Sequence, residues 1–335
     1  MEFEDGDWVI TDGADVDDPA IDGEWVVDNG DEGAVAGVFF HAVSTAARRP
    51  AYAPFGHCPR DLPDPALSFL PPAVSVGSSS HGLVLCRGAW SSYYICNPAT
   101  ARWTPIPRPP RPHPFLSSPA LVLVSRPDSP SLFHLVCLLE SGTGGATAYR
   151  FDTFSSATGE WRSDPAPFPA DPIVPGSGVS AAGMACWRTA STAVLAYDPA
   201  AGAARIVPAP PGCGDDWQLG EAGGGRLCCA RVTESAVEIH ALGPSDRWTL
   251  LGLFAVAAGA DGGDKWEGGE PIVCREAPRP LRFQSANLEV VLWVDGRLVA
   301  VDLGSRWVRE LRFDGPAPRP DEEEYVAHVL EPVSC

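Results

Sequence analysis

The 335-residue sequence lacks the features by which membrane, secreted and metal-binding proteins are most readily recognised. No apolar run reaches the roughly 18 residues that a membrane span requires. The first residues are acidic rather than apolar, so we expect no signal peptide. The ten cysteines include no C-x-x-C pair, and no N-x-S/T glycosylation acceptor is present. The sequence therefore predicts a reduced protein of the cytoplasm and/or nucleus, with no membrane partner.

Motifs for catalysis and for cofactor binding are missing as well. The seven histidines are scattered, without an H-E-x-x-H motif or the Cys/His spacing of a zinc site, and no G-x-S-x-G motif occurs. The glycine-rich segments 142–145 and 223–225 precede no helical pattern and lack the Lys-Ser/Thr of a phosphate-binding loop. We therefore expect no catalytic residues, no metal and no cofactor, and predict that the protein is not an enzyme.

Basic residues are also few, and only one of the 24 is a lysine, Lys265. The 43 acidic residues are unevenly distributed, because 13 of them lie in residues 1–32, which contain no Lys or Arg. The remaining residues carry 30 acidic and 24 basic side chains, a balance that argues against a nucleic-acid partner.

The acidic segment contains a tandem repeat of 17 residues, since Asp5–Gly13 recurs as Asp22–Gly30. We predict a disordered acidic tail over residues 1–33, followed by one folded domain over residues 34–335. The tail either binds a partner or is only a solvated extension.

The remainder of the sequence has the pattern of short β-strands. From Val35 onward, runs of four to seven β-forming residues alternate with turns rich in Gly, Pro, Asp and Ser. The 34 Gly and 35 Pro residues are spread along the chain and would interrupt long helices almost everywhere. The sequence predicts an all-β fold.

A long internal repeat indicates how these strands are organised. Residues 82–99 align without a gap with residues 183–200, at an offset of 101. Related units end in a strand, a turn and, in most cases, a charged residue followed by tryptophan. Six units of this kind can be counted, and the one that ends near residues 48–49 has lost the tryptophan. Their spacing of roughly 50 residues is the period of a kelch-like propeller. We predict a β-propeller of six four-stranded blades.

Two kinds of residue are expected to maintain the blades. An Asx-Pro pair favours a tight turn, because the Asx side chain binds its own backbone and proline presets φ. A tryptophan at the start of the next strand can bury about 150–250 Å² against the adjacent blade. The predicted structural residues are Asn97, Pro98, Trp103, Trp161, Asp198, Pro199, Trp248 and Trp307.

Several segments resemble the F-box-associated domain of plant F-box proteins, especially grass members. They include SSSHGLVLCRGAWSSYYICNPATARWTPIP (78–107), YRFDTFSSATGEWR (149–162) and, later, LGEAGGGRLCCARV. The resemblance extends from about residue 35 to 313. It implies a propeller-like domain that binds the protein to be ubiquitylated, while an N-terminal F-box docks on a Skp-type adaptor of a cullin-RING ubiquitin ligase.

The sequence departs from that family at the F-box. Residues 1–34 show no helical period, and prolines interrupt the F-box-like segment Asp61–Leu67. We therefore expect an unknown protein substrate as partner, with a Skp-type adaptor and cullin only if an F-box is supplied or cryptic. The alternatives are a propeller scaffold outside ubiquitylation and a kelch-like protein that binds or oxidises sugars.

A partner-binding face can be predicted from the order of strands in a kelch-like blade. The loops between second and third strands open at the same end of the ring as the linkers between blades. Trp and Arg residues expected at that end are candidates, because both types are enriched among interface anchors. Each could instead be a solvated charge or a tryptophan packed beneath its own loop. The candidates are Trp90, Arg108, Arg111, Arg188, Trp217 and Trp266.

Overall fold

A computed structural model contains only strands, turns and loops in the residues that it describes, which confirms the predicted all-β class. No helix in this described part could cross a membrane. The acidic segment 1–33 lies outside it. The described residues are 37–40, 51–54, 62–64, 66–72, 74–88, 92–110, 120–126, 129–141, 147–214, 217–222, 225–258, 272–284, 289–302, 308–310 and 328–330.

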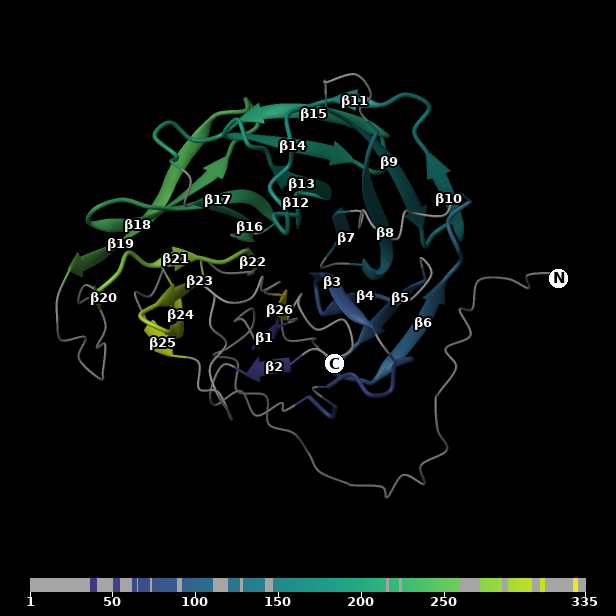
Figure 1. Cartoon of the computed structure of the whole chain (residues 1–335), viewed down its shortest axis with the longest axis horizontal. Helices are drawn as coiled ribbons and strands as arrows, with labels where there is room; N and C mark the ends of the chain where they lie inside the picture. The colour runs from purple at the N-terminus through teal and green to yellow at the C-terminus, as the bar shows by residue number, and fades with distance from the viewer. Residues whose placement is uncertain are drawn as a thin grey trace.

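The strands form six sheets that follow one another around a ring (Figure 1). Five of these sheets have four or more strands and are numbered here as blades 1 to 5. Blade 1 comprises β3 (Ser75–Ser80), β4 (Leu83–Arg87), β5 (Tyr93–Asn97) and β6 (Arg102–Ile106). Blade 2 comprises β7 (Ala120–Arg126), β8 (Ser129–Glu140), β9 (Ala148–Ser155), β10 (Glu160–Ser163) and β11 (Phe168–Pro169). Blade 3 comprises β12 (Val179–Ala181), β13 (Met184–Arg188), β14 (Ala193–Asp198) and β15 (Ala203–Pro208).

The remaining strands form two further blades and a smaller sheet. Blade 4 comprises β16 (Trp217–Ala222), β17 (Arg226–Val232), β18 (Ala236–Leu242) and β19 (Trp248–Ala258), flanked by β20 (Ile272–Cys274) and β22 (Phe283–Gln284). Blade 5 comprises β21 (Arg279–Pro280), β23 (Glu289–Val294), β24 (Arg297–Asp302) and β25 (Val308–Glu310). The sixth sheet, called the closing sheet here, places β1 (Gly37–Phe40) between β2 (Ala51–Pro54) and β26 (His328–Leu330).

The innermost strands close the ring. Around the axis, β26 contacts β3, and contacts continue from β3 through β7, β12, β16 and β22 back to β26. The predicted β-propeller is therefore confirmed, but the predicted number of six four-stranded blades differs from the structure. Five blades of that size are described, and the closing sheet has three described strands. This sheet pairs a strand near the start of the chain with one near its end, a long-range pairing for which a repeat spacing carries no signal.

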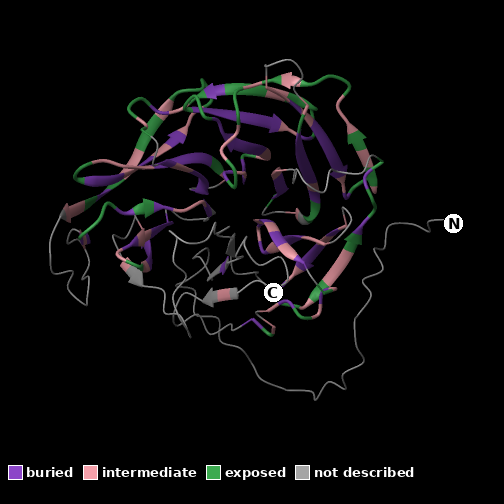
Figure 2. Cartoon of the chain, in the orientation of Figure 1, coloured by how far each residue is buried: buried purple, intermediate pink, exposed green. Residues whose placement is uncertain are grey.

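The core lies between neighbouring sheets, and the inner strands of blades 1 to 4 are more buried than the outer strands β6, β10, β15 and β19 (Figure 2). Alternate residues of a strand face opposite sides, so each blade contributes side chains to the seam before it and the seam after it. Cys228 packs in the seam between blades 4 and 5, whereas Cys229 packs in the seam between blades 3 and 4. This arrangement makes each blade dependent on both neighbours.

The repeat at an offset of 101 is confirmed in the strands and in the turns. Strands β4, β5 and β6 of blade 1 correspond to β13, β14 and β15 of blade 3. The first hairpin of each has positive φ at two successive residues, His81 and Gly82 in one and Ala182 and Gly183 in the other. A two-residue hairpin turn whose twist fits that of the flanking strands requires positive φ at both of its central residues.

The Asx-Pro turns connect the third and fourth strands of the same two blades. The Oδ1 atom of Asn97 accepts from the backbone N–H of Ala99 at 3.0 Å and from that of Thr100 at 3.3 Å. The Oδ1 atom of Asp198 accepts from Ala200 at 2.8 Å and from Ala201 at 3.0 Å. Pro98 and Pro199 follow these Asx residues in the turn.

The tryptophans at the outer strands lie at the seams between sheets. The indole Nε1 of Trp161 in blade 2 donates to the carbonyl oxygen of Pro107, after blade 1, at 2.7 Å. In the same way Trp248 of blade 4 donates to Pro208 of blade 3 at 2.7 Å. Trp103 packs against the core between the closing sheet and blade 1. Trp307 lies outside the described residues.

The seam between blades 2 and 3 has Ala204 in the place of a tryptophan and is closed by polar contacts. Tyr197 stacks on Phe151 with ring centroids 4.0 Å apart. Arg162 of blade 2 donates to the hydroxyl of Tyr197 at 3.2 Å and to the carbonyl oxygen of Pro199 at 2.8 Å. Burial raises the pKa of the Tyr197 hydroxyl, which therefore stays protonated and donates to Asp164 at 3.1 Å.

Candidate interaction face

The antiparallel order of the strands divides the loops between two ends of the ring. The linkers between blades and the loops between second and third strands lie at one end, called the linker end here. The hairpins at residues 81–82 and 182–183 and the Asx turns lie at the opposite end, called the turn end.

Three of the six predicted partner-binding residues are described, and all three belong to the linker end. Arg108 is exposed in the linker after β6, Arg188 is the last residue of β13, and Trp217 is the first residue of β16. The other three, Trp90, Arg111 and Trp266, lie outside the described residues.

Arg188 and Trp217 lie against each other across the seam between blades 3 and 4. The guanidinium carbon of Arg188 is 4.5 Å from the centroid of the Trp217 ring, the geometry of a cation–π contact. Trp217 is only 1% exposed and Arg188 only 7% exposed. In this structure the pair joins two blades beneath the surface, which corresponds to the alternative of a packed tryptophan. Of the three candidates that the structure describes, Arg108 is the exposed one.

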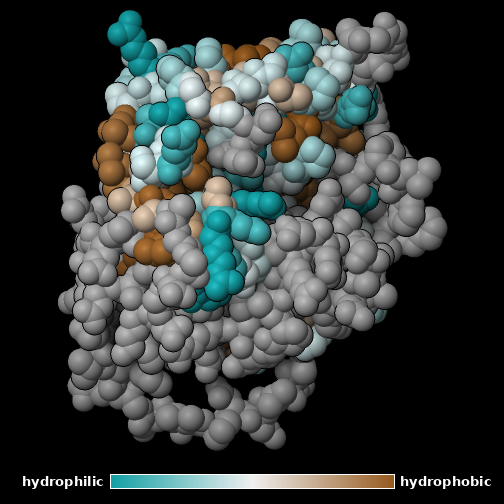
Figure 3. All heavy atoms as spheres, turned by 60° about the vertical axis from the view of Figure 1, so that its left-hand side comes forward, coloured by the Kyte–Doolittle hydropathy of each residue, from teal (hydrophilic) through white to brown (hydrophobic). Residues whose placement is uncertain are grey.

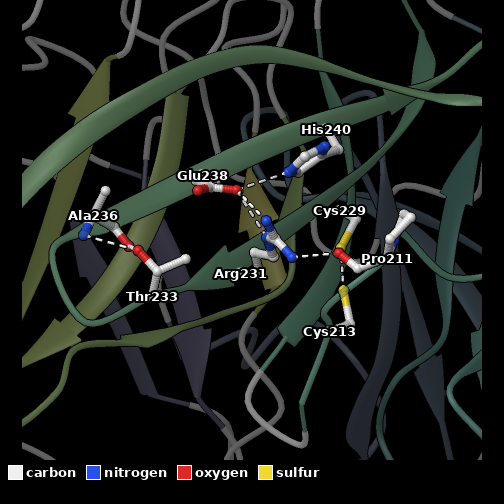
Figure 4. A network of polar contacts seen from close by, with 8 residues as sticks. All are labelled: Pro211, Cys213, Cys229, Arg231, Thr233, Ala236, Glu238 and His240. Atoms are coloured by element: carbon white, nitrogen blue, oxygen red, sulfur yellow. Dashed lines mark hydrogen bonds and ion pairs between the residues drawn. The ribbon is translucent and has the colours of Figure 1, made fainter.

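A second polar cluster lies beside this pair on the hairpin of β17 and β18 (Figure 4). Arg231 donates from Nε and Nη2 to Oε2 of Glu238, at 2.8 and 2.6 Å. His240 Nε2 lies 3.0 Å from the same carboxylate oxygen. Arg231 also donates from Nη1 to the carbonyl oxygen of Pro211 in the preceding linker, and so connects the hairpin to that linker.

The sequence interpretation missed this cluster, although a local signal for part of it exists. A turn at residues 233–235 makes Arg231 and Glu238 direct cross-strand partners, and opposite charges at such positions attract one another. The contact with Pro211 depends on how the linker folds back, and spacing along the sequence does not show that.

The charges of the cluster stabilise the ionised form of Glu238. The hydrogen bond with His240 makes the largest contribution, and the hydrogen bonds and positive charge of Arg231 add to it. Together they outweigh partial burial and lower the pKa of the Glu238 carboxyl from its ordinary value near 4.5. The folded state therefore favours the ionised carboxylate more than the unfolded chain does.

Replacing Glu238 by glutamine is therefore expected to lower the free energy of unfolding by about 1–2 kcal/mol near neutral pH. Because the folded pKa is depressed, this stabilisation is present above the ordinary pKa and is lost as the pH falls through the lower folded value. The difference between E238Q and the unchanged protein should thus shrink as the pH falls below the ordinary value near 4.5 and vanish once the folded carboxyl is protonated. Urea unfolding at several pH values measures the difference in the free energy of unfolding.

E234Q, in the exposed turn of the same hairpin, is the control variant. An equal loss of stability in E234Q and E238Q would contradict the prediction.

On the side of the ring shown in Figure 3, polar and apolar groups are interspersed among the residues that the structure describes, with separate apolar patches between polar ones. Among the described residues, Leu250 and Leu253 on the outer strand β19 are 51% and 55% exposed. Within the same described part no group of three His, Cys, Asp or Glu residues is placed to hold a metal ion.

The closed ring of radially ordered sheets defines this protein as a β-propeller. Residues 59–210, a little under half of the chain, match the family model described as "F-box protein At3g26010-like, beta-propeller". The match includes blades 1 to 3 and confirms the resemblance to the propeller domain of F-box proteins. This family relation suggests a protein-interaction module with protein partners.

Other comparisons give only distant likenesses. No curated protein matches the chain. A functionally unknown protein from Desulfotomaculum acetoxidans DSM 771 shares 10% identity, with 84% of this chain and 82% of that chain covered and a TM-score of 0.41. An auxiliary nutrient binding protein from Bacteroides thetaiotaomicron VPI-5482 shares 9% identity over 71% of this chain and 56% of that one, with a TM-score of 0.37. Similarities this weak do not bear on function.

Proposed function

We propose that this propeller is a non-enzymatic protein-recognition module that serves as the substrate-binding part of an F-box-type ubiquitin ligase receptor. The observation that carries the proposal is the match of residues 59–210 to the propeller of an F-box protein. In this proposal the partner is a protein substrate, and a Skp-type adaptor provides the link to the cullin through an F-box that is cryptic in this chain.

We further propose that the substrate binds at the linker end. Arg108 is exposed there immediately after blade 1. The cluster of Arg231, Glu238 and His240 holds the linker before blade 4 in place. This end of the ring therefore offers an exposed guanidinium and a linker held by a hydrogen bond from Arg231. Arginine is among the residues most enriched in interface anchors.

The first experiment tests the assignment to a ubiquitin ligase. The purified full chain is mixed with a purified Skp-type adaptor, and complex formation is measured by light scattering after gel filtration. A stoichiometric complex is the expected result, because the proposal requires a cryptic F-box in this chain. If no complex forms while protein partners still copurify with the chain, the ligase role is overturned and the scaffold alternative takes its place.

The second experiment tests the binding face with two arginines of the same blade. Arg108 follows β6 at the linker end, whereas Arg102 begins β6 at the turn end, and both are exposed. Once a partner is identified by crosslinking, R108E should weaken its binding by about tenfold or more, and R102E should leave it unchanged. Loss of binding in R102E alone would place the site at the turn end instead.

A further inference from the structure

Two cysteines meet at the linker end, and neither the family relation nor the proposed function accounts for them. The Sγ atoms of Cys213 and Cys229 lie 3.9 Å apart (Figure 4). Cys213 belongs to the linker between β15 and β16, whereas Cys229 lies in the middle of β17. The two thiols are therefore carried by a loop and by a core strand that it crosses.

The two thiols differ in their access to solvent. Cys229 is fully buried in the seam between blades 3 and 4. Cys213 is partly exposed, and every other cysteine in the described part of the chain is buried. An oxidant in solution can therefore reach Cys213 first, and the neighbouring Cys229 is the thiol placed to react next.

The surroundings of Cys213 favour its thiolate, which is the reactive form of a cysteine. The hydrogen bond with Cys229 contributes most, and the positive charges of Arg231 and Arg188 add to it, so that the pKa of the Cys213 thiol is lowered despite burial. The same contact, together with burial, raises the pKa of Cys229. Because the thiolate is the nucleophile, Cys213 is the attacking group and Cys229 remains a protonated thiol until it is needed.

The linker is held in a position from which the bond can form. Residues Pro210 to Cys213 make a turn in which the N–H of Cys213 donates to the carbonyl oxygen of Pro210 at 3.3 Å. Gly212 takes a φ of +79° at the third position of this turn, a conformation that glycine adopts without strain. A disulfide needs the sulfurs at about 2.05 Å, so a shift of the Cys213 side chain and its loop of about 2 Å is enough, and β17 can stay in place.

We propose that Cys213 and Cys229 are a redox-active dithiol that hydrogen peroxide converts reversibly into a disulfide. The Cys213 thiolate attacks one peroxide oxygen, the O–O bond breaks, and Cys213 sulfenic acid forms as hydroxide leaves. Cys229 then attacks the Cys213 sulfur as its thiolate, and the S–S bond forms as the sulfenic hydroxyl leaves. The proton of Cys229 and the departing hydroxyl give water, and a second water forms from the first hydroxide and a solvent proton. A thiol reductant returns both cysteines to the reduced state.

Tryptic mapping of the full chain tests this proposal directly. Trypsin cleaves after Arg205, Arg226 and Arg231, so Cys213 and Cys229 fall in the separate peptides 206–226 and 227–231. After treatment with hydrogen peroxide, the two peptides should appear joined, with a mass two hydrogen atoms below their sum. Dithiothreitol should separate them.

Cysteine variants identify the two partners. Cys228 is next to Cys229 in the same peptide but faces the other seam, where burial raises its pKa to about 12. C228S should still form the joined peptide, and C213S and C229S should lose it. In C229S, Cys213 should remain as a sulfenic acid that dimedone captures, and circular dichroism verifies that this variant is folded.

Three results would overturn the proposal. The first is a joined peptide that persists in C229S and is lost in C228S, because the bond would then involve Cys228. The second is a joined peptide that survives in C213S. The third is conversion of Cys213 in the unchanged protein to sulfinic acid without any joined peptide, which would show that Cys229 does not resolve the oxidised thiol.

Discussion

Replacing Gly220 by alanine is expected to destabilise the propeller by about 2–3 kcal/mol. Gly220 lies in β16, the innermost strand of blade 4, and pairs with Phe283 of the parallel strand β22. A Cβ atom at position 220 would lie 2.4–2.5 Å from three ring atoms of Phe283. That ring is 1% exposed and packs in the core between blades 4 and 5, so it cannot move aside without displacing its neighbours. The added methyl group therefore forces apart the strands that close the ring.

Urea unfolding followed by far-UV circular dichroism measures this loss. Gly214 is the matched control, because a Cβ atom there meets nothing within 4 Å. G214A should change the free energy of unfolding by less than about 0.5 kcal/mol. Adding F283L to G220A should recover part of the loss, since the smaller side chain leaves room for the methyl group. Equal stability of G220A and G214A would contradict the prediction.

Replacing Trp187 by alanine is expected to cost about 3–5 kcal/mol, the range for deleting a large buried aromatic side chain. Trp187 is fully buried on β13 and packs in the seam between blades 2 and 3. Its ring centroid lies 6.2 Å from that of Phe151. A Cβ atom on Gly178 would lie 2.9 Å from its Nε1, which shows how closely the backbone approaches the indole. Alanine leaves a cavity that this rigid seam cannot fill.

Two comparisons separate a cavity effect from a general sensitivity to tryptophan loss. W187F should be clearly more stable than W187A because phenylalanine refills most of the space. W248A should cost less than W187A because Trp248 is only partly buried. The free energy of unfolding of each variant is obtained from the midpoint and slope of its urea unfolding curve. A W187A protein as stable as W248A would show that the seam adjusts to the missing ring.

The parts of the fold that the sequence predicts well are those specified by neighbouring residues. The turn at Asp198 follows from an Asx side chain binding backbone groups two and three residues further on. The hairpin at Gly82 and its counterpart at Gly183 follow from a residue type that accepts positive φ. Because these signals recur at an offset of 101, the repeat located the strands of blades 1 and 3 in the correct places.

The parts that could not be predicted depend on which sheets become neighbours. Arg188 meets Trp217 because two blades pack at one seam, and the two residues are not related by any periodicity. Cys213 meets Cys229 because a linker folds over a strand that follows it. For Arg188 and Trp217 the residue type gave a reason to consider the position. Only the packing of the blades shows that Trp217 is buried and that the two thiols form a pair.

The closing sheet has a consequence for the order in which the protein can fold. β1 pairs with β26, so β1 has its partner only after all the strands between them have been synthesised. Until then β1 presents an unpaired edge and β3 lacks its contact with β26, and unpaired edges are where growing chains associate wrongly. Native stability should therefore appear only once β26 has been made, and the nascent chain has its greatest need of chaperones just before β26 emerges.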